Sequence, residues 1–365
     1  MHQNQVINLD CSFRDGGYYN NWSFKKKEID FYLKNLSQTN IRYVEIGFRL
    51  LNSKNSGLTA YSDDKFIKSL KIKNNLKVGV MINASDFILD NKLDFNKLKK
   101  TFPNFKNLSF IRVAFHNKDL KNVMKISKFL SNKGPEIMLN LMQISELDNK
   151  EILKILKKVN QLKINVFYIA DSFGSLKPTN IKNLSKILKK YCKSKIGFHA
   201  HDNLSLAYQN AIIAIKNDFD YLDSTMLGMG RGAGNLKTEE IYKFIYKDDK
   251  QGLKKIYNIN KKIFKKLKGR YKWGTNRYYR FAATKSIHPS YIQELLNNRA
   301  YQKKNYKNIL KSLANIDSKK YNPKYLINYN NKKLIKYGID KIKLNKDILI
   351  LGSSPNLRLF KKKIK

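Results

Sequence analysis

Residues 165–203, NVFYIADSFGSLKPTNIKNLSKILKKYCKSKIGFHAHDN, decide the fold that we expect for this chain. The stretch begins and ends with apolar runs rich in Ile and Phe, each short enough to be a buried strand. Between these runs, residues 180–191 carry apolar side chains at three- and four-residue spacing, as an amphipathic helix does. A strand, a helix and a second strand in this order indicate a unit of parallel sheet.

The same alternation extends from residue 6 to about residue 248. Further amphipathic stretches occupy residues 26–37, 120–131, 147–162 and 204–216. The apolar runs number eight: VINLDCS (6–12), RYVEIGF (42–48), KVGVMIN (77–83), SFIRVAF (109–115), EIMLNLMQ (136–143), NVFYIADS (165–172), KIGFHAHD (195–202) and DYLDSTML (220–227). Eight strands alternating with helices predict a closed (β/α)8 barrel, a TIM barrel, with an open doubly wound α/β sheet as the alternative.

The strand rhythm stops after residue 248. Residues 253–267 and 291–313 have helical patterns rich in Lys, Tyr and Asn. We therefore expect a catalytic barrel over residues 1–248 and a smaller, mainly helical C-terminal domain over residues 249–365, able to act as a lid. Near the end, DILILGSSPN (347–356) is interpreted as a terminal structural strand, because too few residues follow it to build a nucleotide-binding unit.

Charge is the most unusual feature of the composition, with 73 basic and 28 acidic residues giving a net charge of +45. The excess is mostly Lys dispersed along the predicted helices, whereas specific nucleic-acid recognition usually enlists Arg. We interpret it as a solvated surface that can concentrate anionic substrates. No specific nucleic-acid partner is expected.

Cellular location is inferred from the cysteines and from the hydropathy. Cys11 and Cys192 lie in no CxxC pair, so neither a disulfide framework nor a zinc–thiolate site is expected. No apolar run approaches ~18 residues, and no export signal begins the chain. We expect a cytoplasmic protein without a membrane partner, and a homo-oligomer is left open.

Polar residues close several of the apolar runs, at the end of a barrel where active sites lie. The first run leads into Arg14 and Asp15, the second contains Glu45, the fourth is followed by His116, and the sixth contains Asp171. The seventh run ends in HAHDN. The chemistry is therefore expected at this mouth of the barrel.

His199 and His201 are the strongest candidates for a metal site. Alternate strand residues point to the same side, so both imidazoles can bind one ion. Asp15 can reach the same ion across the mouth, although such a residue before two glycines is by itself more often a turn former. One carboxylate, two imidazoles and open positions suit Mg, Mn, Co or Zn. Of the five histidines, only His2 lies clear of the predicted site.

A glycine-rich stretch, LGMGRGAGN (227–235), follows the eighth run. Its spacing fits neither of the common phosphate-binding motifs, and no residue is predicted to bind an organic cofactor. We interpret it as a flexible lip over the site. It ends in Asn235, whose side-chain oxygen is a candidate for a weak further metal ligand.

Four separated motifs carry a family resemblance: LDCSFRDGG (9–17), VEIGF (44–48), FHAHDN (198–203) and GMGRGAGN (228–235). Together they resemble the DRE-TIM metallolyase superfamily over residues 5 to about 240, most closely its aldolase and HMGL-like branches. The resemblance implies that Asp15, His199 and His201 bind the metal, with Asn235 as a further ligand. It also implies that Arg14 lies beside an enolate oxygen.

The sequence departs from the aldolase branch at one catalytic position. The aldolases carry a His two residues after the glycine of their RDG motif, whereas this chain has Tyr18. The acid/base is therefore sought among Tyr18, His116 and His288, the last of which is held extended before Pro289. The C-terminal region shows no similarity to the domain through which the aldolase partners a dehydrogenase, so substrate channelling is not expected.

The resemblance predicts a divalent-metal-dependent aldolase, with Mn or Mg as the expected cofactor and Co or Zn as alternatives. Its substrate would be a 4-hydroxy-2-oxo acid. The enzyme would cleave this acid to a pyruvate enolate and an aldehyde, or form it from them. An acyl-CoA condensing enzyme of the isopropylmalate synthase type is the alternative within the fold. A nucleic-acid-binding protein on an inactive barrel is the alternative from another class, although all the ligand positions are intact.

Overall fold

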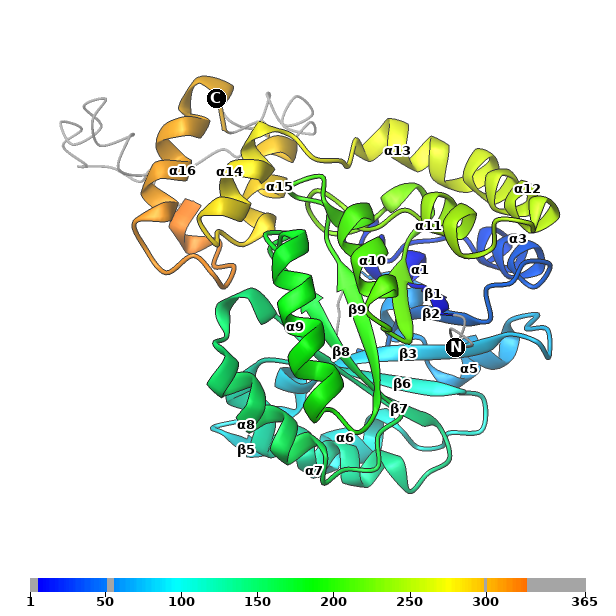
Figure 1. Ribbon diagram of the computed structural model, residues 1–365. Coiled ribbons are helices and arrows are strands. Elements are labelled where there is room, and N and C mark those ends of the chain that lie inside the picture. Colours follow the sequence, from blue (N-terminus) through cyan, green and yellow to red (C-terminus); the bar gives the residue numbers. More distant parts are fainter. Residues whose placement is uncertain (1–5, 51–55, 299–300, 327–365) are drawn as a thin grey trace, which may run out of the picture. The chain divides into compact units, whose positions relative to one another are not determined.

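Eight parallel strands close into a barrel in the computed structural model of the chain (Figure 1). The order around the barrel is β1-β10-β9-β8-β7-β6-β3-β2, and β1 pairs with both β10 and β2. The strands are β1 (Ile7–Asp10), β2 (Tyr43–Phe48), β3 (Lys77–Asn83), β6 (Phe110–Phe115), β7 (Glu136–Leu141), β8 (Val166–Asp171), β9 (Lys195–Ala200) and β10 (Tyr221–Ser224). All eight predicted strands are confirmed, and closure of the sheet excludes the doubly wound alternative.

The structure describes residues 6–50, 56–298 and 301–326. The chain from Met1 to Tyr321 forms one compact unit, and Asn322–Lys365 forms a second. A functional division of the chain at residue 248 stays a prediction. The expected strand at 347–356 and His2 lie outside the described residues.

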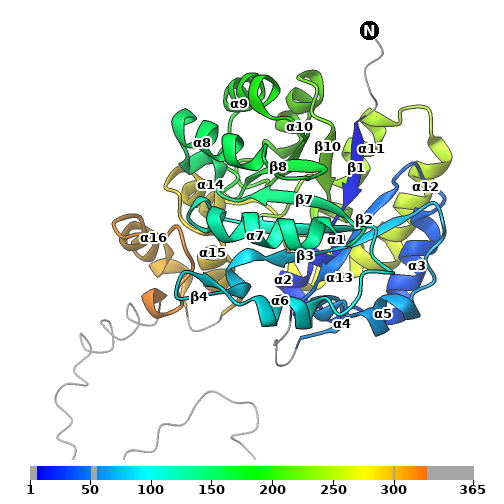
Figure 2. The same ribbon diagram turned by 90° about the horizontal axis from the view of Figure 1, so that it is seen from below.

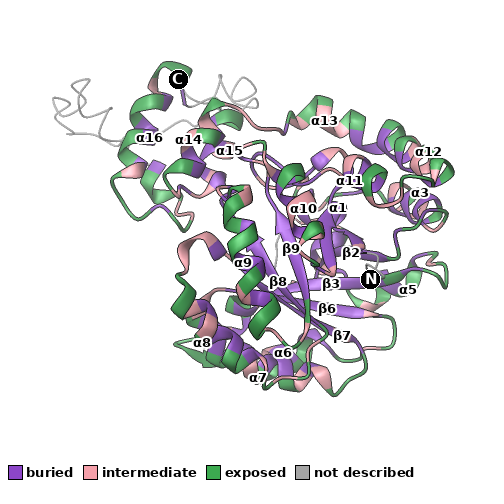
Figure 3. Cartoon of the chain, in the orientation of Figure 1, coloured by how far each residue is buried: buried purple, intermediate pink, exposed green. Residues whose placement is uncertain are grey.

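Helices surround the strands, as two perpendicular views show (Figures 1 and 2). Their solvent sides are exposed and their inner sides buried (Figure 3). The larger ones are α3 (Lys26–Leu36), α7 (Leu120–Ser131), α8 (Asn149–Val159), α9 (Pro178–Tyr191), α10 (Ala207–Lys216), α11 (Thr238–Ile245), α12 (Lys250–Ile259), α14 (Arg277–Thr284), α15 (Pro289–Asn297) and α16 (Tyr306–Ala314). The shorter ones are α1 (Ser12–Asp15), α2 (Gly17–Asn20), α4 (Leu58–Tyr61), α5 (Asp64–Ser69), α6 (Phe95–Thr101) and α13 (Lys265–Tyr271). A small hairpin, β4 (Ile88–Leu89) and β5 (Lys92–Leu93), lies between β3 and α6.

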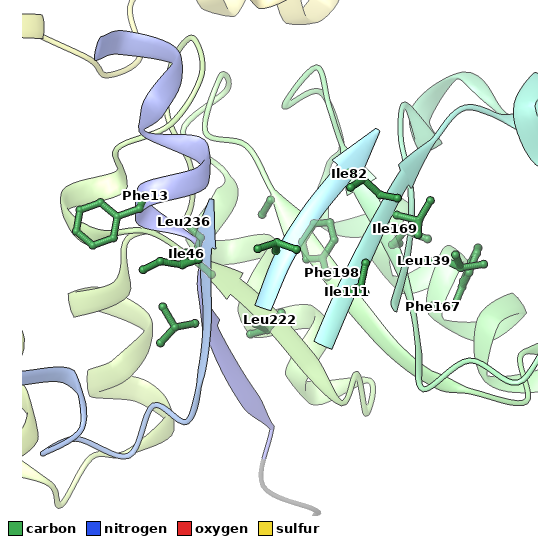
Figure 4. Packing of buried hydrophobic residues seen from close by; sticks show 14 of the residues in the cluster. Phe13, Ile46, Ile82, Ile111, Leu139, Phe167, Ile169, Phe198, Leu222 and Leu236 are labelled. Carbon is green, nitrogen blue, oxygen red and sulfur yellow. The ribbon is translucent and has the colours of Figure 1, made fainter. Parts of the chain in front are cut away.

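Alternation along the strands divides the apolar side chains between two layers. Ile111 belongs to the large cluster that the strands share with the helices, as do Ile82 and Leu139 on neighbouring strands (Figure 4). The intervening residue Phe110 belongs to a separate cluster inside the barrel. Arg112, two residues further on, is fully buried and therefore lies in the barrel interior as well. The barrel thus carries a buried charge above an apolar floor.

The first strand ends earlier than expected. We predicted Arg14 and Asp15 at the end of a strand, but β1 stops at Asp10 and both residues lie on the helical turn α1. The Asp10 carboxylate explains the change of conformation, because it accepts the backbone N–H of Ser12 at 2.9 Å and begins the turn. The turn carries Arg14 and Asp15 over the mouth of the barrel.

The chain beyond residue 248 is helical, with two differences from the prediction. The helix expected at 253–267 runs from α12 through a π-helical turn, Asn260–Phe264, into α13. The single helix expected at 291–313 is instead two, α15 and α16, because the backbone leaves the helical region at Asn298, the second of two adjacent asparagines, which are poor helix formers. Within the described residues, no helix combines the length and apolarity needed to cross a bilayer.

Candidate active site

Asp15, His199, His201 and Asn235 lie together at the mouth of the barrel, and all four are buried. The Nε2 atoms of the two histidines are 3.1 Å apart, and Asp15 Oδ2 lies 3.2 Å from Nε2 of His199. Asn235 Nδ2 donates a hydrogen bond to the same Asp15 oxygen. The structure thus brings together the four residues that we predicted as metal ligands.

The spacing of these atoms fits a small divalent cation. Two ligand atoms that bind one cation at ~2.1 Å and at right angles lie ~3 Å apart, which is close to both measured separations. The Oδ1 atom of Asn235 is buried and has no hydrogen-bond partner among the described residues. A buried acceptor without a donor is costly, and a cation would satisfy it.

Cys11 is an alternative to His201 as the third ligand beside Asp15 and His199. Its Sγ lies with ligand atoms of Asp15 and His199 in a group whose members are all within 4.8 Å of one another. Burial raises the pKa of the Cys11 thiol well above its usual value, and only the thiolate binds metals well. We therefore favour His201, whose burial and neighbouring charges lower its pKa well below the usual value and keep the ring neutral.

Arg14 is fixed between two carboxylates. Its Nη1 lies 2.7 Å from Asp15 Oδ1, and its Nε donates to Glu45 Oε1 at 2.5 Å. The remaining nitrogen, Nη2, is buried and has no hydrogen-bond partner among the described residues. Arg14 therefore holds the candidate ligand Asp15 in place and keeps one donor free at the mouth.

Further charges complete a closed ring beneath the cluster. Arg112 Nη1 lies 3.3 Å from Glu45 Oε2, and its Nη2 donates to Asp223 at 2.6 Å. The same Asp223 oxygen lies 2.8 Å from Nδ1 of His199, which closes the ring. With Asp15 and Arg14, three carboxylates oppose two guanidiniums, so the ring carries one net negative charge before any histidine is protonated. Such a charge favours a cation at its upper edge.

Sequence reasoning missed Arg112 and Asp223. Both interrupt apolar runs at positions that the period of two assigns to the barrel interior. A charged residue inside a buried strand must find an opposite charge, so this signal could have been used.

The ring also sets the protonation of the site. Burial alone would lower the pKa of His199, but hydrogen bonds and charges from Asp15 and Asp223 raise it above its usual value. Burial would raise the pKa of Asp15, yet Arg14 and His199 hold it well below its usual range. Nδ1 of His199 is hydrogen-bonded to the Asp223 carboxylate, and Nδ1 of His201 donates to the carbonyl oxygen of Ser172 at 3.2 Å. Both Nε2 atoms are thereby aimed at the candidate cation position.

The three acid/base candidates surround the same mouth. The Tyr18 ring packs edge-on against Trp22, with centroids 5.1 Å apart, and burial raises the pKa of its hydroxyl. His116 follows β6, and burial lowers its pKa. Burial and the charges of Arg231, His201 and His116 lower the pKa of His288 well below its usual value. His288 also caps α15, because its Nδ1 accepts the Ser290 N–H at 3.3 Å.

Asp171, which also closes a predicted strand, serves the loop that follows it. Its two carboxylate oxygens accept backbone N–H groups of Ser175 at 2.9 Å and Leu176 at 3.1 Å. Burial raises the pKa of Asp171 to about 7. The residue shapes the connection from β8 to α9, and its interaction with His199 is electrostatic.

The glycine-rich stretch is anchored, so its interpretation as a flexible lip is wrong. Gly232 donates its N–H to Gln293 Oε1 at 3.0 Å and accepts from the Tyr19 hydroxyl at 2.5 Å. The Gly234 carbonyl oxygen accepts from Asp202 N at 2.8 Å. Both glycines have positive φ, at +68° and +92°, which explains why the segment needs them. Arg231, between Gly230 and Gly232, is thereby presented to the mouth, and sequence reasoning had not singled it out.

Comparison with known proteins agrees with the barrel fold. The HMGL-like family model matches residues 105–263. The chain is 24% identical over 242 residues to oxaloacetate decarboxylase of Mycobacterium tuberculosis, covering 65% of this chain and 69% of the relative. It is 27% identical over 235 residues to 4-hydroxy-2-oxovalerate aldolase of Carboxydothermus hydrogenoformans, covering 63% and 68%.

A solved structure extends the match. The N-terminal domain of a putative aldolase from Bacteroides vulgatus superposes with a TM-score of 0.71 at 31% identity, covering 81% of this chain and 98% of that one. The barrel and the relatives together define an enzyme of the carbon–carbon lyase class. The chain belongs to the HMGL-like family, within the DRE-TIM metallolyase superfamily.

Proposed function

We propose that the chain is a divalent-metal-dependent aldolase that cleaves or forms a 4-hydroxy-2-oxo acid, with pyruvate and an aldehyde as the two halves. The observation that carries the proposal is the convergence of Asp15 Oδ2 and the two histidine Nε2 atoms, each within 3.2 Å of a neighbour. The names of the relatives above support it, because oxaloacetate and 4-hydroxy-2-oxovalerate are both 2-oxo acids.

Asp15, His199 and His201 would hold the cation, and Asn235 Oδ1 would be a further oxygen ligand. A bound divalent cation would supply Lewis-acid polarisation of the substrate carbonyl. The chain's own contribution is Arg14, whose unpartnered Nη2 can donate to the oxygen on which enolate charge develops. Its Nε and Nη1 are tied to Glu45 and Asp15, so this donor is already oriented before substrate binds.

Cleavage also needs a base that takes the proton of the 4-hydroxyl group. The raised pKa of Tyr18 keeps its hydroxyl protonated, so it can donate a hydrogen bond but cannot take the substrate's proton. Because Nδ1 of His288 accepts the Ser290 N–H, the neutral ring carries its proton on Nε2 and is a donor too. His116 is neutral at neutral pH, since burial lowers its pKa. We assign the base to His116 and hydrogen-bond donation to Tyr18 and His288.

The assignment predicts a difference in pH profiles. In the wild type, kcat/KM should fall on the acidic side as the pH drops through the lowered pKa of His116, because the protonated ring cannot accept. His116→Ala should lose that limb, while His288→Ala should lower the rate and retain it. Loss of the limb in His288→Ala alone would transfer the role of base to His288.

The proposed reaction is tested by pyruvate release from a panel of 4-hydroxy-2-oxo acids that differ in the aldehyde half, with added Mn²⁺. We expect release from at least one member and none from the matched 2-oxo acids without the 4-hydroxyl. Acyl transfer from an acyl-CoA to a 2-oxo acid is the parallel assay. Activity there, with no pyruvate release from the panel, would contradict the aldolase proposal.

A further inference from the structure

Arg231 differs from the other arginines of the described interior. Arg14, Arg49 and Arg112 are buried, and each lies within 3.3 Å of a carboxylate oxygen. Arg231 is only part-exposed, yet it forms no ion pair with any described residue, and its Nε is buried without a hydrogen-bond partner among them. A guanidinium whose Nε has lost water without gaining a hydrogen-bond partner is unfavourable unless a ligand completes it.

Among the described residues, this guanidinium contacts an aromatic ring. Its central carbon lies 5.5 Å from the centre of the Tyr18 ring. A cation–π contact uses the face of the guanidinium and leaves the N–H donors around its edge unused. Those donors form the planar fork that suits a carboxylate or a phosphate.

Two aromatic rings link Arg231 to Arg14. The Arg14 guanidinium carbon is 5.8 Å from the centre of the Phe48 ring, and the Phe48 and Tyr18 rings pack edge to face with centroids 6.2 Å apart. Arg231 covers the Tyr18 ring in turn. The two guanidiniums therefore contact different rings of one aromatic pair, and only that of Arg14 is also paired with the candidate ligand Asp15.

Arg231 also lies beside the acid/base candidates. Its charge lowers the pKa values of His116 and His288 and acts on that of Tyr18. The aldehyde half of the substrate must face these residues, because the 4-hydroxyl belongs to that half. Arg14 and the candidate cation position would serve the 2-oxo acid half. Arg231 would then contact the aldehyde half of the substrate.

The loop holds Arg231 in place before any ligand binds. Gly232, the next residue, is bonded to Gln293 and Tyr19, and a Cβ added to it would lie 2.7 Å from Cβ of Pro289. A cation on an anchored backbone loses little freedom on binding, which favours a built subsite over a mobile surface charge.

We infer that Arg231 is the specificity residue for an aldehyde half that carries a carboxylate or phosphate group. This inference rests on the aldolase proposal for the reaction and on the unpaired guanidinium for the subsite. It makes the full substrate a dianion or trianion, with one acidic group at each end.

The first test is condensation of pyruvate with three aldehydes: propionaldehyde, succinic semialdehyde and D-glyceraldehyde 3-phosphate. We expect kcat/KM to be highest for one of the two anionic aldehydes, which identifies the anion as carboxylate or phosphate. Arg231→Met should lower the ratio of that value to the propionaldehyde value about 10- to 100-fold, the range of one charge-assisted hydrogen-bond pair. The ratio is the readout because the charge of Arg231 also acts on His116, which would change both rates together. Arg231→Lys should recover part of the loss, since it keeps the charge without the fork.

The second test is binding without turnover. Calorimetry with succinate and with inorganic phosphate on the metal-free protein should show binding that Arg231→Met weakens and Arg280→Met does not. Arg280 is the matched control, because it is an exposed arginine on α14 whose Nη2 contacts Ser205.

The outcomes separate the two proposals. If no aldehyde condenses with pyruvate but anion binding depends on Arg231, the aldolase function fails and the subsite stands. If propionaldehyde is the best substrate, or if Arg231→Met and Arg280→Met bind anions equally, the inference about Arg231 is overturned while the aldolase function remains.

Discussion

Two side chains of this site each have one buried polar atom without a hydrogen-bond partner among the described residues. Nε and Nη1 of Arg14 are paired with carboxylates, and its Nη2 has no partner among the described residues. Nδ2 of Asn235 donates to Asp15, and its Oδ1 likewise has no described partner. A free donor and a free acceptor, both buried, are the features that a polar ligand and a cation would satisfy.

Arg14→Lys tests the donor. A lysine can keep the charge but cannot hold two carboxylates and direct a third N–H at the same time. We expect kcat to fall ~10²-fold or more, because one preorganised donor to an oxyanion is worth ~3 kcal/mol. Metal content should be retained, measured on the same samples. An unchanged kcat would exclude Arg14 from the transition state.

Asp223→Asn tests how the ring controls the metal. In the metal-free protein the pKa of His199 is raised by Asp15 and Asp223, and that of His201 is lowered, so a single proton competes with the cation. Metal affinity should therefore be full above the pKa of His199 and fall about tenfold per pH unit below it. Asp223→Asn should move this fall to lower pH and weaken binding at high pH by about 10- to 100-fold.

The measurement is Mn²⁺ affinity as a function of pH in both proteins. A slope of two protons in the wild type would show that both histidines are protonated in competition with the cation. The same midpoint in Asp223→Asn would show that Asp223 does not set the protonation of His199.

At the scale of elements, the strands were predictable and their exact ends were not. The strands are mostly apolar because helices cover them on one side and the barrel fills them on the other. The end of β1 depends on a side-chain contact, since the Asp10 carboxylate turns the chain at Ser12. The break between α15 and α16 falls at Asn298, and a hydrogen bond from the Tyr306 hydroxyl to the Leu295 carbonyl oxygen then links the two helices.

The glycine-rich loop carries the prediction that belongs to this scale. Gly232→Ala places a Cβ at a φ of +68° and against Pro289, so unfolding should require about 1 to 3 kcal/mol less. Gly269→Ala in α13 is the control, since a Cβ there meets nothing within 4 Å, and it should be neutral or stabilising by up to about 1 kcal/mol. Urea denaturation measures both. Equal stabilities would show that the loop is not anchored as described.

At the scale of the whole molecule, the fold and the grouping of Asp15, His199 and His201 at the barrel mouth followed from sequence, but the network of charges around them did not. His199 and His201 could be paired because a strand period fixes their common side. No period could state that Arg112 would bridge Glu45 and Asp223, or that Arg231 would lack a carboxylate, since both facts depend on strands and loops far apart in the chain. Charge partners are therefore the part of this site that only the three-dimensional arrangement supplies.

The central claim is that one divalent cation, held by Asp15, His199 and His201, is required for pyruvate release. The most direct measurement is metal content by mass spectrometry, made alongside pyruvate release, on the wild type and on a His199→Gln/His201→Gln double variant. We expect one ion per wild-type chain, loss of both ion and activity with EDTA, recovery of both with Mn²⁺, and neither in the double variant. Full pyruvate release from metal-free wild-type protein, or one ion per chain in the double variant, would contradict it.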